Sequence, residues 1–298
     1  MQRSKPDPPS IVFDAGHGEE VTPEESDVSQ LRTLLQTNGF KLATLHKAIT
    51  LASLKSHSVC VLGNPLGSTF SQKEIAAVEA YIKAGGGLLM VSGATIFGKG
   101  GDGARKTNLA AIAQHFGLGF SERAIQRSPG RADADTAGTA DAFVATLAAQ
   151  HPLSQGVLHL QFVSGTAVTP GTTSHTLFRI GDAPAAPAVV VADTYGKGRV
   201  LALGGSTLFF NTYIDTLDHE VFLVRAFRWL ADVPLTASIH RLEKLKPEFE
   251  VSSESVETLR EIRLRLDAFE KEVKELKEVI LATIDELRRV LRSLQEGK

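Results

Sequence analysis

Residues 195–231 constrain the fold of this chain more than any other segment. A Gly-Lys-Gly turn at 196–198 leads into the run Val200–Leu203, which contains no polar residue and is followed by two glycines and a serine. Such a run is typical of a strand buried on both faces, and glycine permits the tight turn before it. The amphipathic stretch Asp218–Ala231 then predicts a helix. The segment therefore predicts one strand and helix of an α/β domain.

The same alternation of short apolar runs and helical periodicity occurs earlier in the chain. Strands buried on both faces and separated by helices predict a mostly parallel sheet with helices on both faces. The shorter pieces after residue 159 predict antiparallel strands, so that half of the sheet is expected to be mixed. The predicted strands are 11–13, 40–45, 59–62, 88–91, 159–169, 175–180, 188–192 and 199–203, and the first predicted helices are 27–37 and 71–83.

Composition excludes several classes of protein. The chain has 298 residues, 43% of them apolar, which is enough for a globular core. A net charge of −2 without a clustered basic patch argues against nucleic-acid binding. The single cysteine, Cys60, excludes an intramolecular disulfide framework. No apolar segment is long enough for a membrane helix or a signal peptide, so a cytoplasmic location is expected.

Changes in composition predict four regions. Residues 1–10 contain three prolines and little to bury, and we expect a disordered arm. Residues 11–236 form the α/β domain, 237–251 a linker, and 252–298 a long helix with a coiled-coil pattern. From 239 to 298, 13 Lys and Arg are balanced by 14 Asp and Glu, which is typical of a helix surface with many salt bridges.

Apolar residues in the C-terminal region alternate three and four positions apart without a slip. This spacing is that of a coiled-coil seam. With Leu259 at position a, opposite charges at Arg265 and Glu270, and at Glu272 and Lys277, suit a parallel pair of helices in the first half. The second half has a wider apolar stripe, which further helices, a partner or the globular domain could cover. The seam comprises Leu259, Ile262, Leu266, Phe269, Val273, Leu276, Ile280, Thr283, Leu287, Val290 and Leu294.

Several segments occur in the order found in one known family. The N-terminal run Ile11–Glu19 and the segment 195–215 are the most informative, the latter with Gly198, Gly204, Ser206, Phe209 and Asp215 in place. Between them come Asn64–Pro65, Phe70–Glu74, Tyr81–Gly87, Thr107–Leu109, Phe116–Gly117 and His151–Leu153. Residues 11–233 resemble the GIFT family, a glutamine-amidotransferase-like α/β domain of a core subunit of eukaryotic intraflagellar transport and of bacterial gliding (DUF4350-type) proteins.

The resemblance implies an amidotransferase- or flavodoxin-like sheet in a bacterial relative of this family. It carries over no active site, because the family has no established catalytic residues, and it implies scaffold or ligand-binding work. Amidotransferase-like folds place a nucleophile at the turn after a central strand, where this chain has Ser92. Serine there could attack a carbonyl if a histidine and an oxyanion hole were close. Capping or a tight turn is the alternative role of Ser92.

A group of polar residues is expected at the carboxyl edge of the sheet. Asp14, His17 and Glu19 follow the first strand, at the edge where open α/β sheets bind ligands. These three could hold a metal or polarise a substrate, but their spacing matches no metal motif, so no metal and no cofactor are predicted. Ser206 and Asn211 follow the last core strand. With Ser92, these residues form the predicted ligand pocket, for a sugar or a nucleotide.

These observations favour a non-catalytic adaptor that assembles through its coiled coil with itself or with a protein partner. The first alternative is a module that senses a carbohydrate or nucleotide through the predicted pocket. The second alternative is a hydrolase that uses Ser92. A solvent-open pocket that contains a histidine with a shifted pKa favours the alternatives, whereas a filled, apolar strand edge favours the adaptor.

Overall fold

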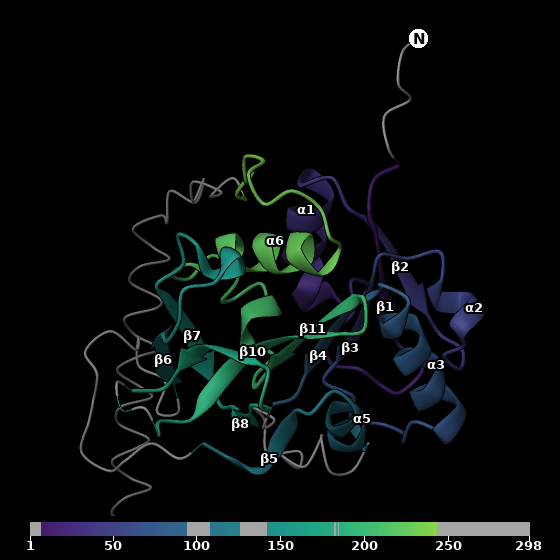
Figure 1. Cartoon of the computed structure of the whole chain (residues 1–298). Coiled ribbons are helices and arrows are strands. Elements are labelled where there is room, and N and C mark those ends of the chain that lie inside the picture. The colour runs from purple at the N-terminus through teal and green to yellow at the C-terminus, as the bar shows by residue number, and fades with distance from the viewer. Residues whose placement is uncertain (1–6, 94–107, 126–141, 182, 184, 243–298) are drawn as a thin grey trace, which may run out of the picture. The chain divides into compact units, whose positions relative to one another are not determined.

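The chain divides into two compact units, Met1–Leu242 and Glu243–Lys298. The computed structural model describes residues 7–93, 108–125, 142–181, 183 and 185–242, all of which belong to the first unit (Figure 1). The predicted coiled-coil seam and most of the predicted arm lie outside the described residues. None of the described helices is both long and apolar enough to cross a membrane.

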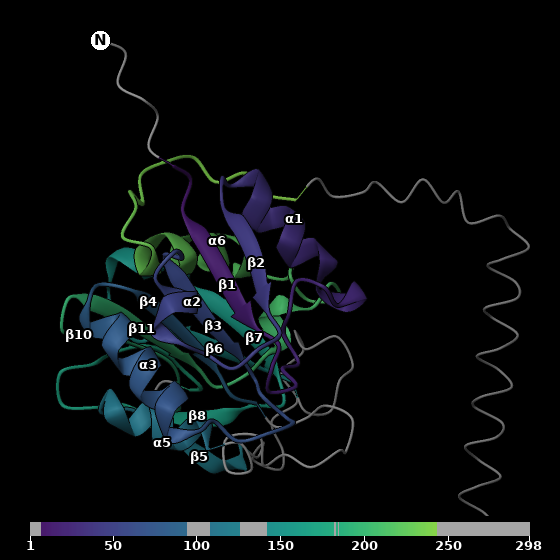
Figure 2. The ribbon, with the colours of Figure 1, turned by 90° about the vertical axis from the view of Figure 1, so that its right-hand side faces the viewer.

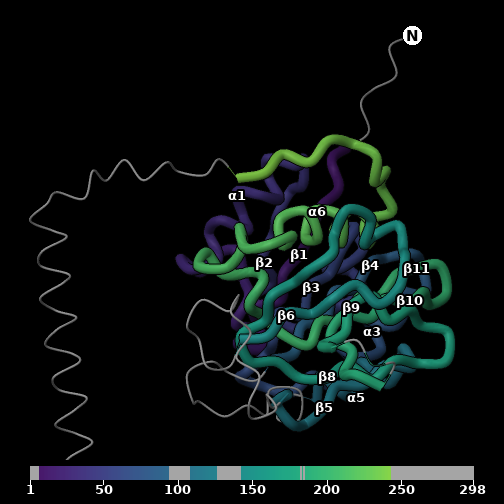
Figure 3. Tube along the Cα trace, turned by 90° about the vertical axis from the view of Figure 1, so that its left-hand side faces the viewer, coloured from purple at the N-terminus to yellow at the C-terminus, as the bar shows by residue number. Residues whose placement is uncertain are grey.

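A nine-stranded sheet forms the centre of the described unit. Its strands, in spatial order, are β2 (Lys41–Leu45), β1 (Ser10–Asp14), β3 (Val59–Gly63), β4 (Gly87–Val91), β11 (Gly198–Leu203), β10 (Ala188–Tyr195), β9 (His175–Arg179), β6 (Ala142–Leu147) and β7 (His159–Val163). The pairs from β2 to β11 are parallel, and those from β11 to β7 are antiparallel. Figure 3 shows the antiparallel half, where β6, β9 and β10 lie together.

The order β2-β1-β3-β4-β11 is that of a flavodoxin-like sheet, with β11 in the place of the fifth strand. The prediction of a mixed second half is confirmed. One strand predicted over 159–169 is instead two, because the chain turns at Ser164, whose φ is 57°. Its second part, β8 (Thr166–Thr169), pairs with β5 (Gly119–Ala124) in a separate two-stranded sheet.

Helices cover both faces of the parallel half, as predicted (Figure 2). One face packs against α1 (Ser29–Thr37) and α6 (His219–Leu230), and the other against α2 (Leu51–Leu54), α3 (Gln72–Lys83) and α5 (Leu109–His115). Both faces of the sheet are apolar because successive side chains of a strand alternate between them. In β1, Phe13 points to the first face and Val12 to the second. Three short 3-10 helices, η1 (Ser26–Val28), η2 (Pro152–Ser154) and η3 (Thr207–Phe209), lie in the connections.

Local sequence explains two features of the domain, a tight turn and a helix cap. The Gly-Lys-Gly turn joins β10 to β11 with Gly196 at a φ of 61°, a conformation that glycine adopts without a steric cost. Helix α3 begins with a capping box, in which the Ser71 hydroxyl accepts from the Glu74 N–H and the Glu74 carboxylate accepts from the Ser71 N–H. This reciprocal pair fixes the Glu74 side chain in place.

The end of the domain lies later than the sequence suggested. Helix α6 ends at Leu230, before Pro234, and the chain continues along the domain to Leu242. Arg228 donates to the carbonyl oxygens of Ala237 and Ser238, and the Leu242 N–H donates to Glu220. Residues 237–242, predicted as part of the linker, are therefore attached to the domain.

Side chains from residues 207–219, which end at the first residue of α6, cover the outer edge of β7. The outward N–H groups of His159, Gln161 and Val163 donate to Asp218, His219 and Thr207, respectively. An edge strand with free N–H groups invites pairing with other chains. This edge is therefore closed by side chains and offers none of these three donors to a further strand.

Candidate functional site

Polar residues gather at the carboxyl ends of β1, β3, β4 and β11. Asp14 ends β1, Asn64 follows β3, Ser92 follows β4 and Ser206 comes shortly after β11. All four are buried. Since these strands are parallel neighbours, their carboxyl ends meet at one edge, as the sequence predicted.

The loop after β1 folds back onto the loop after β3. Glu19 pairs with Pro65 in an isolated bridge, and the N–H groups of Glu20 and Val21 donate to the carbonyl oxygens of Asn64 and Gly63. Gly63 lies so close to Val21 that a Cβ atom at this position would be 2.4 Å from the Val21 carbonyl oxygen. These contacts hold Asp14, His17 and Glu19 in one cluster.

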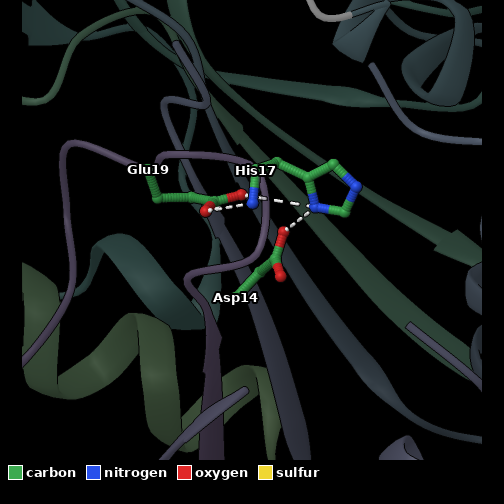
Figure 4. A group of neighbouring side chains, drawn as sticks. All are labelled: Asp14, His17 and Glu19. Carbon is green, nitrogen blue, oxygen red and sulfur yellow. Dashed lines mark hydrogen bonds and ion pairs between the residues drawn. The ribbon is translucent and has the colours of Figure 1, made fainter. Parts of the chain in front are cut away.

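His17 lies at the centre of the cluster (Figure 4). Its Nδ1 is 2.6 Å from Asp14 Oδ2 and 3.9 Å from Glu19 Oε1, and its Nε2 is 3.4 Å from Glu74 Oε1. The imidazole ring also packs against the ring of Phe70, with centroids 4.0 Å apart. Both ring nitrogens therefore face carboxylates.

Burial and neighbouring charges set the protonation of the cluster. Burial opposes ionisation of Asp14, but hydrogen bonding by His17 and the Gly16 N–H outweighs it and lowers the Asp14 pKa. Burial likewise opposes a charge on His17, but Asp14 and Glu74 outweigh it and raise the His17 pKa. For Glu19, burial and the Asp14 carboxylate act together and raise the pKa to about 9. In the cluster, Glu19 is therefore the carboxyl group that keeps its proton at neutral pH.

A second network connects the cluster to β4 and β11. The carboxylate oxygen Glu20 Oε2 accepts hydrogen bonds from Asn64 Nδ2 and Ser206 Oγ, both at 2.7 Å. The Asn64 side-chain oxygen accepts from the Gly93 N–H at 3.1 Å, and Asn64 has a φ of 59°. Ser206 is thus part of the site through Glu20.

Ser92 and Asn211 have different surroundings. Ser92 is buried, and its hydroxyl has no hydrogen-bond partner in the part of the chain that the structure describes. Asn211 lies apart, since its side chain bonds to Ser26, Ser29 and Gln30 at the start of α1. Asn211, one of the predicted pocket residues, therefore connects the segment after β11 to the start of α1 and lies away from the cluster.

Sequence reasoning missed Glu20, Asn64 and Glu74 as members of the site. Glu74 is signalled only by the Ser71-Gln-Lys-Glu74 pattern, which predicts a helix cap and not a contact with His17. Asn64 is the residue after a predicted strand, but its left-handed conformation has no sequence signal beyond the preference of asparagine for it. Glu20 has no sequence signal that distinguishes it from other acidic residues, and it joins the site only because the two loops are brought together.

The matches to known proteins agree with this arrangement. Residues 10–129 match the family model of the IFT52 GIFT domain. The resemblance to the GIFT family is confirmed. The mmIFT52 N-terminal domain is 18% identical with a TM-score of 0.61, and the match covers 78% of this chain and 99% of that domain. No curated protein sequence matches significantly.

Two bacterial structures also share the fold. Cytoplasmic protein STM1381 from Salmonella typhimurium LT2 is 14% identical, with a TM-score of 0.53 over 74% of this chain and 99% of that protein. A ThuA-like protein from Parabacteroides merdae ATCC 43184 is 14% identical, with a TM-score of 0.52 over 78% of this chain and 92% of that protein. Identities this low establish the fold alone.

Proposed function

We propose that this protein is a non-catalytic adaptor, in which the GIFT-like domain binds a protein partner and residues 252–298 assemble the chain as a coiled coil. The observation that carries the proposal is that side chains of the domain itself fill the carboxyl edge of the sheet. His17 faces Asp14 and Glu74, and Glu20 binds Asn64 and Ser206. The GIFT resemblance, which implies scaffold or ligand-binding work, is compatible with this role.

Ser92 and Cys60 lack the surroundings that a catalytic nucleophile needs. A serine nucleophile needs a base within hydrogen-bond reach, and the Ser92 hydroxyl has no partner among the described residues. Cys60 lies within β3, and burial raises the pKa of its thiol, so the thiolate that would act as a nucleophile is suppressed. Neither residue supports acyl transfer in this arrangement.

The charges beside the seam favour a second copy of this chain as the partner in the proposed coiled coil. Arg265 and Glu270, and Glu272 and Lys277, have the g-to-e spacing at which a parallel homodimer forms opposite-charge pairs. The seam residues themselves supply the apolar contact. We therefore expect the protein to associate with itself, at least through the first half of the seam.

Substitutions in the seam test this assembly. Leu266→Asp and Leu276→Asp place a charge at core positions a and d, so each should shift dissociation to at least tenfold higher protein concentration. Ala268→Asp adds the same charge at an outward position and should leave the dissociation unchanged. Analytical ultracentrifugation of the full chain measures all three. If the seam variants and the control dissociate at the same protein concentration, the proposal is contradicted.

A ligand-sensing module is the second candidate. It is favoured by two buried oxygen atoms at the edge, Glu19 Oε1 and Ser92 Oγ, which have no partner among the described residues. A carbohydrate or nucleotide that used them should raise the thermal midpoint of the protein, and Ser92→Ala should reduce that shift. Thermal melts with panels of monosaccharides and nucleotides measure it, and an absence of any shift counts against this function.

A further inference from the structure

Three metal-ligating atoms of different residues converge at the end of β1. Asp14 Oδ2, His17 Nδ1 and Glu19 Oε1 belong to a group whose ligand atoms all lie within 4.8 Å of one another, and Figure 4 shows the three side chains directed at one place. The spacing of these residues matches no metal motif, so the sequence predicted no metal. The convergence arises from the loop that follows the strand.

The remaining oxygen of each carboxylate is held by the loop backbone. The Gly16 N–H donates to Asp14 Oδ1 at 3.1 Å, and the His17 N–H donates to Glu19 Oε2 at 3.1 Å. These bonds leave Asp14 Oδ2 and Glu19 Oε1 to face the imidazole. The loop therefore presents one oxygen atom of each carboxylate to the same point.

The far side of the imidazole is oriented as in metal-binding histidines. Such a histidine usually places its other ring nitrogen against a carboxylate or a carbonyl group, which fixes the ring. Here His17 Nε2 is 3.4 Å from Glu74 Oε1, and that oxygen is itself held by the Ile49 N–H at 3.0 Å. Phe70 packs on the ring. His17 Nδ1 is thus the nitrogen turned toward the cluster.

Glu19 provides an independent sign that a ligand belongs here. Its side chain is 0% exposed, and Glu19 Oε1 has no hydrogen-bond partner in the part of the chain that the structure describes. Among these residues, no Lys or Arg side chain bonds to Asp14, Glu19 or Glu74. A buried carboxyl oxygen without a hydrogen-bond partner is costly, and a cation that displaces the proton of Glu19 would satisfy it.

The separations are close to those of a coordinated ion. Bonds of about 2.1 Å in tetrahedral geometry place two ligand atoms about 3.4 Å apart. His17 Nδ1 is now 2.6 Å from Asp14 Oδ2 and 3.9 Å from Glu19 Oε1, so each separation needs to change by less than about 1 Å. We propose that Asp14, His17 and Glu19 bind a divalent first-row transition metal ion, with zinc favoured by the mixed imidazole and carboxylate ligands.

Zinc binding to the full chain, prepared without a histidine tag and stripped with a chelator, tests the proposal. Isothermal titration with Zn²⁺ should show a site that also raises the thermal midpoint of the protein. Glu19→Gln keeps the shape of the side chain but replaces the free carboxylate oxygen, and should weaken this binding at least tenfold. Glu24→Gln is the matched control, because the Glu24 side chain is exposed and pairs with His46 outside the cluster, and this variant should bind zinc as the unchanged protein does.

Glu74→Gln tests the orienting carboxylate without removing a ligand. Loss of such a partner typically costs 10- to 100-fold in metal affinity. This variant keeps the test decisive if Glu19→Gln does not fold, which a melt followed by Trp229 fluorescence would reveal. Co²⁺ in place of Zn²⁺ should give ligand-field absorption bands that Glu74→Gln shifts. The proposal is overturned if the unchanged protein binds zinc no more tightly than Glu19→Gln, or if Glu24→Gln weakens binding as much as Glu74→Gln.

Discussion

His219 should make the stability of the domain depend on pH. Its Nε2 accepts a hydrogen bond from the Gln161 N–H at 2.8 Å, and its Nδ1 lies 2.7 Å from the Tyr213 carbonyl oxygen. The neutral ring with its proton on Nδ1 satisfies both contacts. A second proton on Nε2 would face the Gln161 N–H, so two donors would oppose each other. His219 thus closes the β7 edge only while it is neutral.

The size of the effect follows from the pKa. Burial lowers the His219 pKa from 6.5 to about 4. Between these values the unfolded chain binds the proton and the folded chain does not, so the free energy of unfolding falls as the pH falls. The contribution of His219 is complete above pH 6.5 and is lost as the pH approaches 4. A shift of this size corresponds to about 3 kcal/mol.

Urea unfolding of the full chain and of His219→Gln, followed by Trp229 fluorescence from pH 7.5 to pH 4, measures this contribution. Glutamine can accept and donate at this position but does not titrate, and the other titrating groups are common to both proteins. The difference in unfolding free energy should therefore change by about 3 kcal/mol in favour of the variant as the pH falls. A difference that stays constant across this range would refute the assigned role of His219.

Substitutions of Asn64 and Ser92 at the carboxyl edge should differ in their effect on stability. Asn64→Ala removes the acceptor of the Gly93 N–H and places alanine, which has no polar side chain, at a positive φ. It should therefore lower the free energy of unfolding, measured with urea, by about 2–4 kcal/mol. Asn64→Gly should cost about 1 kcal/mol less, and equal losses would contradict this explanation. Ser92→Ala removes a buried hydroxyl that has no partner among the described residues, so the free energy of unfolding should change by less than about 1 kcal/mol. A larger loss would mean that the hydroxyl is bonded in solution.

The parallel half of the fold could be predicted from the sequence, because strands buried on both faces have runs without polar residues. Val59–Gly63 and Gly87–Val91 are buried throughout, and the sequence placed both strands to within one residue. Strand β6 was not predicted, because an apolar run as short as Ala142–Leu147 does not distinguish a strand from part of a helix, and the strand is stabilised by pairing with distant strands. Its place depends on tertiary contacts and not on local pattern.

The candidate site was predictable only in part, for a similar reason. Asp14, His17 and Glu19 follow a strand end, and that position alone indicates a site in an α/β sheet. Glu74 contacts His17 because a helix cap and a loop meet, and their separation in the sequence gives no sign of it. Likewise, His219 closes an edge strand that lies 58 residues earlier in the chain. Such contacts follow from the folded arrangement.

The most direct test of the adaptor proposal is the mass of the protein in solution with and without its C-terminal region. Light scattering should be measured over a concentration series for the full chain and for a chain that ends at Leu242, where the first compact unit ends. We expect the full chain to form a defined oligomer and the shortened chain to be a folded monomer. A full chain that stays monomeric at all concentrations, or a shortened chain that keeps the same oligomer, would contradict assembly through residues 252–298.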